Sequence, residues 1–189
     1  MKITPVPHGL DLGISHALRS GGLHMSDIYN DLFQELEPKR YKRDEAPDPL
    51  RIEAGLALEQ TLEQGLKQRL GNRPGEFITT DGVVYSPDLL IFNGETRLGE
   101  IKLTWMSSRE VPRETAAGFP PKFDKYFVQM KAYCHHLETP YARLLAYFVN
   151  GDYRPPRPEL LAWDITFTAQ ELRDNYQMLL NHARNRGML

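Results

Sequence analysis

The hydrophobic period of the sequence changes near residue 71. Before this point, leucines recur every four residues, at Leu58, Leu62, Leu66 and Leu70. This spacing predicts one face of a helix over residues 50–70, with a C-terminal signal at Gly71 and Asn72. After it, the period is that of extended chain, and three strands are expected at 76–80, 83–92 and 96–104. A chain that combines both periods belongs to the α/β class.

Further helices and strands are expected on both sides of this region. Ser26 is a candidate N-cap for a helix that ends at Pro38. Residues 105–121 are expected to form a long loop, followed by a helix over 123–137. Strands are expected at 142–149 and 160–167, and the pattern Thr168 to Glu171 is a capping box that opens a C-terminal helix. The expected order is helix, helix, three strands, helix, strand, strand and helix.

Length and composition fit one domain. The 189 residues are 41% hydrophobic and 25% charged, which is enough apolar content for a single core. Within one domain over 1–189, we expect an arm and helix at 1–49, a core at 50–150, and a strand plus helix at 151–189. The net charge of -2 excludes a polycation that coats nucleic acid by charge alone.

The single cysteine and the hydropathy pattern exclude further kinds of site and of protein. Cys134 alone cannot form an intramolecular disulfide, a four-cysteine zinc site or a four-cysteine iron–sulfur cluster. No apolar run is long enough to span a membrane, and the N-terminus lacks a signal-peptide pattern. A cytoplasmic protein is therefore expected.

Charged residues interrupt the strands that are expected to be most buried. The run Leu89, Leu90, Ile91 and Phe92 is apolar on both faces, as in a central strand. Asp88 precedes it, and Glu100 and Lys102 share one face of the next strand, because side chains alternate along a strand. Such charges are seldom buried unless they are paired or bind a metal.

The turn between these two strands decides whether Asp88 joins Glu100. A two-residue loop at Asn93-Gly94 would pair Asp88 with Gly99 and separate the carboxylates. A three-residue loop over 92–94, with Gly94 in the left-handed conformation, would pair Asp88 with Leu98 and bring the carboxylates to one face. A bulge at Gly99 would do the same. We predict an irregular connection of this kind.

Two carboxylates and a lysine on one sheet face suit phosphodiester hydrolysis. Hard oxygen ligands favour Mg²⁺ or Mn²⁺, as one ion or two. The metal would activate water, and the ammonium would orient that water or offset developing charge. The alternatives are a buried ion pair between Asp88 and Lys102, or two ordinary surface acids.

The sequence around these residues resembles the PD-(D/E)XK nuclease superfamily over roughly 50–150. Pro87-Asp88 and Glu100-x-Lys102 match its core motif. Residues 55–59 look like the GxxxE motif of the RecB-like and YqaJ-like branches, and Gln129 to Tyr133 resembles their QxxxY motif. The resemblance implies a restriction-endonuclease-like core of helix, three-strand meander, helix and strand. An extra N-terminal helix and a C-terminal strand plus helix would flank it.

The resemblance also implies roles for individual residues. Glu59, Asp88, Glu100 and the backbone carbonyl of Ile101 would bind metal. Lys102 would position or activate the attacking water. Gln129 and Tyr133, one turn apart on a helix, would orient the site or the substrate strand. A solvent-facing Glu59 is the alternative, with Glu53 and Glu63 as rivals, and Gln129 and Tyr133 could be rim and core residues.

The cysteine count selects among members of this branch. Several of its exonucleases carry a four-cysteine iron–sulfur cluster, which Cys134 alone cannot hold. The chain therefore resembles the cluster-free members, including phage recombination exonucleases of the lambda exonuclease and YqaJ kind. DNA is the implied partner, together with a recombination or single-strand-binding protein, and such enzymes often form homo-oligomers.

Basic and aromatic residues near the expected site are candidates for DNA contacts. They are Trp105, Arg109, Arg113, Lys122 and Lys125. Packing is the alternative role for Trp105. The preferred function is a DNA exonuclease in recombination or end resection. The alternatives are an endonuclease of the same fold that acts on branched or single-stranded DNA, and a non-catalytic nucleic-acid-binding module.

Overall fold

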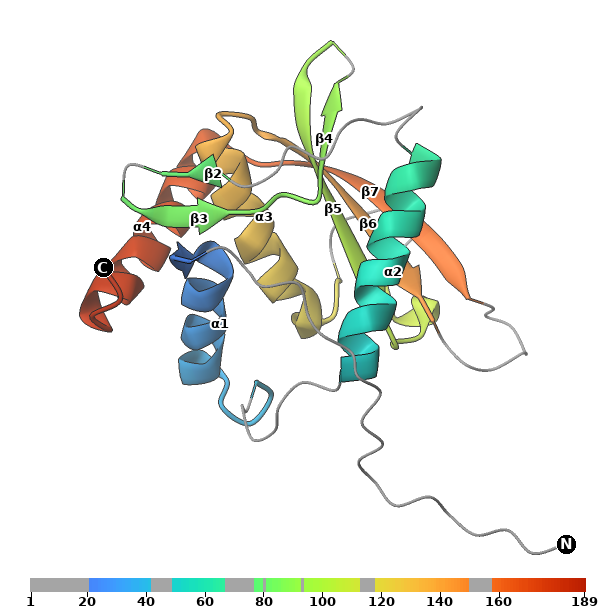
Figure 1. The fold of residues 1–189 in the computed structure, drawn as a ribbon, viewed down its shortest axis with the longest axis horizontal. Coiled ribbons are helices and arrows are strands. Elements are labelled where there is room, and N and C mark those ends of the chain that lie inside the picture. The colour runs from blue at the N-terminus through green and yellow to red at the C-terminus, as the bar shows by residue number, and fades with distance from the viewer. Residues whose placement is uncertain are drawn as a thin grey trace, which may run out of the picture.

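The computed structural model describes residues 21–41, 49–66, 77–79, 81–92, 94–112, 118–149 and 158–189. Within these ranges the chain has a mixed α/β fold with two sheets and four α-helices (Figure 1). The helices are α1 (Met25–Leu36), α2 (Pro49–Leu66), α3 (Asp124–His136) and α4 (Ala169–Asn185). The strands are β1 (Leu23–His24), β2 (Phe77–Ile78), β3 (Val83–Tyr85), β4 (Leu89–Phe92), β5 (Thr96–Thr104), β6 (Tyr141–Phe148) and β7 (Glu159–Thr166).

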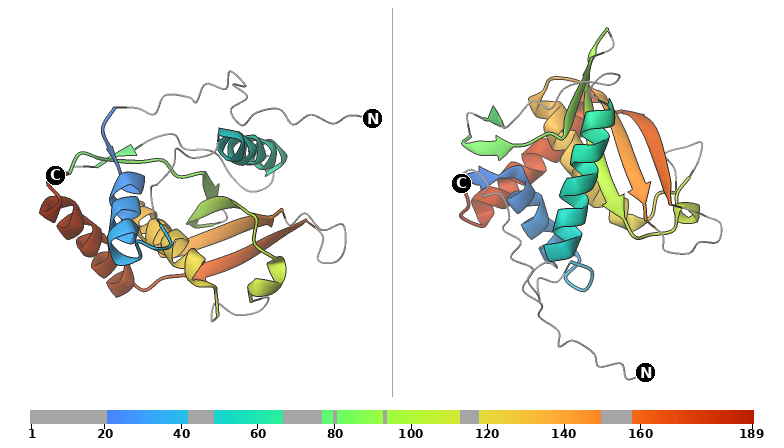
Figure 2. Two further views of the ribbon diagram at one scale, coloured as in Figure 1. Left: turned by 90° about the horizontal axis from the view of Figure 1, so that it is seen from below. Right: turned by 45° about the vertical axis from the view of Figure 1, so that its right-hand side comes forward.

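The larger sheet has the strand order β4-β5-β6-β7. β5 and β6 are parallel, because α3 crosses over between them, and both edge strands are antiparallel to their neighbours. Leu98, Leu144 and Phe148 of this sheet belong to the main core, as does Met130 of α3. α2 contacts β5 from the side opposite α3, so helices cover both faces of the sheet (Figure 2).

The smaller sheet has the order β1-β3-β2. β1 is parallel to β3, and β2 is antiparallel to it. α1 and α4 pack together beside this sheet and against α3 (Figure 1). Buried side chains of these helices, among them Met25, Ile28 and Leu179, complete the main core.

The strand predicted over residues 83–92 is two strands that belong to different sheets. β3 ends at Tyr85, β4 begins at Leu89, and Pro87 lies between them. Proline has no N–H to donate, and it restricts the residue before it, so a ladder cannot continue through this position. The expected three-strand meander is therefore divided, with β2 and β3 in one sheet and the β4–β5 hairpin in the other.

β4 is an edge strand, which corrects the prediction that its apolar run is central. Leu89 and Ile91 are buried, but Phe92 is 62% exposed. An apolar run of four residues does not by itself distinguish a covered strand from an edge strand. Among the described strands, β5 is the one that pairs with β4, so the other side of β4, next to Asp88, has no strand partner there.

Local hydrogen bonds determine where α1 and α4 begin. α1 begins at Met25, so the prediction of Ser26 as its N-cap is wrong. His24 takes that place, and its backbone N–H donates to Asp27 Oδ2 across 3.1 Å. The predicted capping box of α4 is confirmed: Thr168 N–H donates to Glu171 Oε2 across 2.8 Å, and Glu171 N–H donates to Thr168 Oγ1 across 3.2 Å.

The remaining predictions concern loops and termini. The expected loop at 105–121 contains two short 3₁₀ helices, η1 (Ser108–Glu110) and η2 (Pro121–Phe123). The predicted helix end at residues 67–72 lies outside the described residues. Cys134 is buried and forms no disulfide among the residues the structure describes. Over the same residues, the helices are all too short or too polar to cross a bilayer.

Candidate active site

The β4–β5 hairpin sets Asp88 opposite Glu100. Leu89 pairs with Gly99 and Phe92 pairs with Thr96, so one further step of the same register places Asp88 across from Glu100. Opposite residues of an antiparallel pair point to the same face of the sheet. The two carboxylates therefore share a face, although Asp88 itself lies just outside the ladder.

The connection that creates this register has three residues, 93–95, and Gly94 has a φ of 78°. An irregular connection with a left-handed Gly94 was predicted, but it lies one residue further along the chain than expected. Asp88 is consequently opposite Glu100 and not opposite Leu98. The alternative of a bulge at Gly99 is not realised, because Gly99 pairs regularly with Leu89.

Asp88 is held at the end of β4 by the backbone of β5. Its Oδ2 accepts a hydrogen bond from the Ile101 N–H across 2.8 Å. Both backbone polar groups of one strand residue point toward the same neighbouring strand, so the Ile101 carbonyl is on the Asp88 side. The register continued by two steps sets Pro87 opposite Ile101, and proline has no N–H to donate to that carbonyl.

Glu100 is a fully buried carboxylate with charged and neutral partners. Its side chain has 0% exposure, and its Oε1 forms an ion pair with Lys102 Nζ. Gln129 Nε2 of α3 donates to the same oxygen across 2.6 Å. A buried carboxylate requires such compensation, because burial without partners would cost several kcal/mol.

Lys102 is the cationic member of this group. Burial lowers its pKa, but the nearby carboxylates of Glu100 and Asp88 outweigh burial and raise the pKa well above its ordinary value. Its Nζ also lies 5.6 Å from the ring centre of Tyr126, in a cation–π contact. The ammonium is therefore charged at neutral pH, and it interacts electrostatically with both carboxylates.

α3 supplies two further side chains to this site. Gln129 and Tyr133 are both buried and lie one turn apart on this helix. The Tyr133 ring packs 5.4 Å from that of Tyr85. Burial raises the pKa of Tyr133 well above its ordinary value, and the Glu100 carboxylate adds to the rise. Tyr133 thus remains a neutral phenol beside the acids.

Tyr29 of α1 is a site neighbour that the sequence analysis did not identify. Its hydroxyl donates to Gln129 Oε1 across 3.1 Å. The sequence contains no signal for this contact, since the two residues are 100 positions apart and Tyr29 belongs to an ordinary apolar stripe of its helix. The hydrogen bond fixes which way the Gln129 amide faces.

The side chain of Glu59 lies outside the described residues, as does that of its rival Glu63. The backbone of both belongs to α2, which packs against β5. The other rival, Glu53, is half-buried on the same helix. A metal-binding role for Glu59 stays a prediction.

Four of the five residues predicted to contact DNA belong to the described part of the chain. Trp105 follows β5 and is 56% exposed, and Arg109 is exposed on η1. Lys122 Nζ donates to Thr104 Oγ1 across 3.1 Å. Lys125 lies over the rings of Tyr29 and Tyr41, at 5.6 and 5.4 Å.

Arg113 lies outside the described residues. Of the remaining candidates, Lys122 and Lys125 contact protein side chains, while Trp105 and Arg109 are exposed. The DNA-binding role of all five residues stays a prediction.

Solved structures with a similar architecture include two exonucleases and SSO0001. LHK-Exo in complex with dAMP, an alkaline exonuclease from Laribacter hongkongensis, matches with a TM-score of 0.53 and 17% identity, over 87% of this chain and 89% of that one. A phage-related exonuclease from Haemophilus somnus 129PT matches with a TM-score of 0.54 and 12% identity, over 85% and 79%. SSO0001 matches with a TM-score of 0.52 and 17% identity, over 90% and 79%.

This chain has the fold of alkaline and phage-related exonucleases. The resemblance stated from the sequence motifs is thereby confirmed at the level of the fold, at identities too low to transfer activity. No family model matches the sequence, and no curated protein matches it.

The donor set at this site fits a hard divalent cation. Asp88, Glu100 and the Ile101 carbonyl offer oxygen ligands on one side of β5. Oxygen donors with carboxylate charge are what Mg²⁺ and Mn²⁺ prefer in proteins. These residues could therefore hold such an ion beside the Lys102 ammonium.

Proposed function

We propose that this chain is a Mg²⁺- or Mn²⁺-dependent deoxyribonuclease that acts as an exonuclease in DNA recombination or end resection. The observation that carries the proposal is the placement of Asp88 opposite Glu100, with Lys102 paired to Glu100. The exonuclease fold of its structural neighbours supports the choice of exonuclease over endonuclease.

In this proposal, Asp88, Glu100 and the Ile101 carbonyl hold the metal, with Glu59 of α2 as a further ligand. When bound, the ion polarises a phosphoryl oxygen and makes its bound water more acidic. Lys102 orients the attacking water and offsets the charge that develops on the phosphoryl group. Gln129 holds Glu100 in place, while Tyr133 packs behind the carboxylates as a neutral phenol and helps to orient the site.

The scissile strand would approach along the outer side of β4 and the segment after β5. Trp105 would stack on a base, and Arg109, Lys122 and Lys125 would contact phosphates. Arg113 is expected to add to the same basic surface. Recruitment by a recombination or single-strand-binding protein, and assembly into a homo-oligomer, belong to the same hypothesis.

End-labelled linear duplex, single-stranded DNA and covalently closed circular DNA, each with Mg²⁺ or Mn²⁺, test the proposal. We expect degradation of linear DNA, intact circles, and no cleavage in EDTA. Nicking of closed circles or cleavage of junctions would indicate an endonuclease instead. Asp88→Asn and Lys102→Ala should abolish cleavage under conditions in which circular dichroism shows that each variant is still folded, and activity that survives both substitutions would refute the mechanism.

A further inference from the structure

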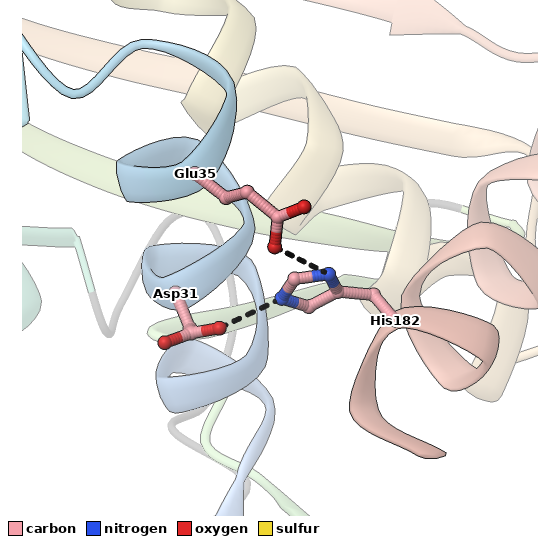
Figure 3. A group of neighbouring side chains, drawn as sticks. All are labelled: Asp31, Glu35 and His182. Carbon is pink, nitrogen blue, oxygen red and sulfur yellow. Dashed lines mark hydrogen bonds and ion pairs between the residues drawn. The ribbon is translucent and has the colours of Figure 1, made fainter. Parts of the chain in front are cut away.

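A second group of metal-binding side chains lies between α1 and α4. Asp31 and Glu35 are one turn apart on α1, and His182 of α4 projects between them (Figure 3). His182 Nε2 is 2.9 Å from Asp31 Oδ2, and Nδ1 is 3.8 Å from Glu35 Oε2. One ligand atom from each residue lies within 4.8 Å of the others.

This group is open to solvent on one side. His182 is 9% exposed and Asp31 18%, whereas Glu35 is 61% exposed. The three residues share a cavity of about 460 Å³, which is lined by Asp31, Gln34, Glu35, His182, Asn185 and Arg186. An ion could enter from the side of Glu35 and reach the buried imidazole.

We propose that Asp31, Glu35 and His182 bind one divalent transition-metal ion, with Zn²⁺ as the best-suited member of the class. An imidazole nitrogen among the ligands favours Zn²⁺, Co²⁺ or Ni²⁺ over Mg²⁺. Two carboxylates balance the ion's charge, and water would complete a four-ligand site. This site is separate from Asp88 and Glu100 and does not rest on the proposed nuclease function.

The distances allow such an ion after a small adjustment. Two ligands about 2.1 Å from a tetrahedral ion lie roughly 3.4 Å apart, so the 2.9 Å pair of Asp31 and His182 must open by about 0.5 Å. Glu35 is exposed and can change rotamer to bring its carboxylate to the ion. The backbone of α1 and α4 need not move.

Arg186 competes with a metal ion for the carboxylate of Asp31. Its Nε donates to Asp31 Oδ2 across 2.9 Å and its Nη2 to Oδ1 across 3.4 Å. The plain alternative is therefore an ion-pair network that joins α1 to α4 without metal. Arg186 is 53% exposed, so it can release the Asp31 carboxylate at little cost when an ion binds.

Calorimetric titration of the full chain with Zn²⁺ alone tests the proposal, in an Asp88→Asn background that weakens the other carboxylate site. We expect one Zn²⁺ per chain and a Zn²⁺-dependent rise in Tm that excess Mg²⁺ does not remove. His182→Gln and Glu35→Gln should each weaken Zn²⁺ binding at least tenfold. Glu37→Gln, which removes another α1-end carboxylate paired with Arg40, should leave it unchanged.

Two further results separate the metal site from the ion-pair network. Arg186→Gln should tighten Zn²⁺ binding, because it removes the competitor, whereas in a metal-free network it would only lower Tm with and without Zn²⁺. Glu35→Gln keeps the test decisive if His182→Gln fails to fold, because Glu35 is exposed. Equal Zn²⁺ affinity in the background protein, His182→Gln and Glu35→Gln would overturn the proposal.

Discussion

Gln129 of α3 donates a hydrogen bond from Nε2 to Glu100 Oε1 of β5 across 2.6 Å. This contact joins the crossover helix to the strand that carries both Glu100 and Lys102. Because Tyr29 of α1 in turn donates to Gln129 Oε1, the amide has one defined orientation. A buried carboxylate at the centre of the site is thus positioned by three elements that are distant in sequence.

Loss of the Gln129 amide should reduce activity more than stability. We expect Gln129→Ala to lower single-turnover cleavage of linear duplex DNA by about 10- to 100-fold, as for other groups that orient a metal-binding carboxylate. Tyr29→Phe removes only the hydroxyl that orients Gln129 and should cost less than about tenfold. Circular dichroism checks folding. A Gln129→Ala variant with the wild-type rate at all Mg²⁺ concentrations would contradict this role.

Loss of the Lys102 charge should destabilise the fold through Glu100. Lys102→Met leaves a fully buried carboxylate without its cation, and we expect the free energy of unfolding to fall by about 3 kcal/mol. The double variant Lys102→Met/Glu100→Gln should recover most of this loss, because it removes the buried charge. Urea unfolding in EDTA measures both effects. Strictly additive losses would show that the two residues are not coupled.

The elements that sequence could predict are those whose signals are local. The bounds of β5 match the predicted range. Its apolar spacing lies within the strand, and the turn residues that mark its ends are directly next to it in the sequence. The capping box of α4 was equally predictable, since Thr168 and Glu171 are three residues apart. In both cases the physical cause and the sequence signal lie in the same short segment.

The features that sequence could not predict depend on contacts between distant segments. The chain passes from one sheet to the other at Pro87, and which strands flank β3 and β4 is decided by long-range pairing. The Tyr29 to Gln129 hydrogen bond spans 100 residues. For the site itself, alternation placed Glu100 with Lys102, but the partner of Asp88 depended on where the three-residue connection begins.

Gly99 should be intolerant of any side chain. A Cβ at this position would lie 2.9 Å from the Cβ of Leu89 on the paired strand. We expect Gly99→Ala to lower the free energy of unfolding by about 1–3 kcal/mol, the usual cost of overpacking.

Gly55→Ala provides the matched control for Gly99→Ala. Gly55 lies inside α2, and a Cβ there would meet nothing within 4 Å among the described residues. This substitution should stabilise the protein by about 0.5–1 kcal/mol, because glycine is unfavourable inside a helix. Urea unfolding compares the two variants, and equal effects of both would argue against the close approach of β4 and β5.

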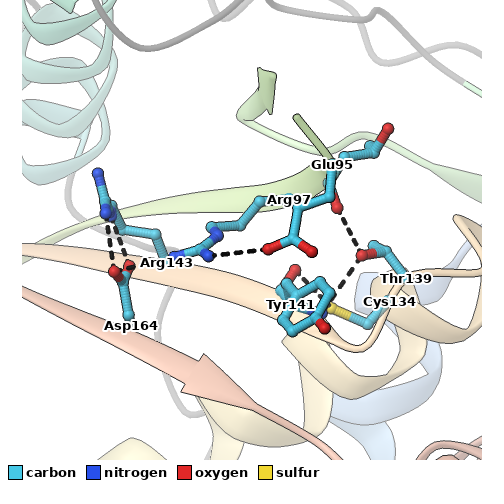
Figure 4. A network of polar contacts seen from close by, with 8 residues as sticks. Glu95, Arg97, Cys134, Thr139, Tyr141, Arg143 and Asp164 are labelled. Atoms are coloured by element: carbon cyan, nitrogen blue, oxygen red, sulfur yellow. Dashed lines mark hydrogen bonds and ion pairs between the residues drawn. The ribbon is translucent and has the colours of Figure 1, made fainter. Parts of the chain in front are cut away.

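Asp164 should make the sheet sensitive to acid. It lies on β7, accepts two hydrogen bonds from Arg143 of β6 at 2.6 and 2.8 Å, and pairs with Arg97 of β5 at 2.8 Å (Figure 4). The hydrogen bonds from Arg143 are the main reason that the pKa of Asp164 falls from 3.8 to about 2. The ionised form is therefore favoured in the folded protein.

The sign of the resulting pH dependence follows from this lowered pKa. The stabilisation is complete above the ordinary value of 3.8 and is lost as the pH falls toward about 2. Because Asp164 is 51% exposed, we expect Asp164→Asn to cost less than about 1 kcal/mol at pH 7. The difference from wild type should shrink between pH 4 and pH 2 in urea unfolding curves.

Asp174→Asn is the control for Asp164→Asn, since it removes an exposed α4 carboxylate whose described contact is the neutral Gln170 amide. Its effect on unfolding should be smaller at pH 7 and should change less between pH 4 and pH 2. A difference between Asp164→Asn and wild type that grows on acidification would reverse the expected sign. It would mean that the arginines of β5 and β6 stabilise the sheet without the Asp164 charge.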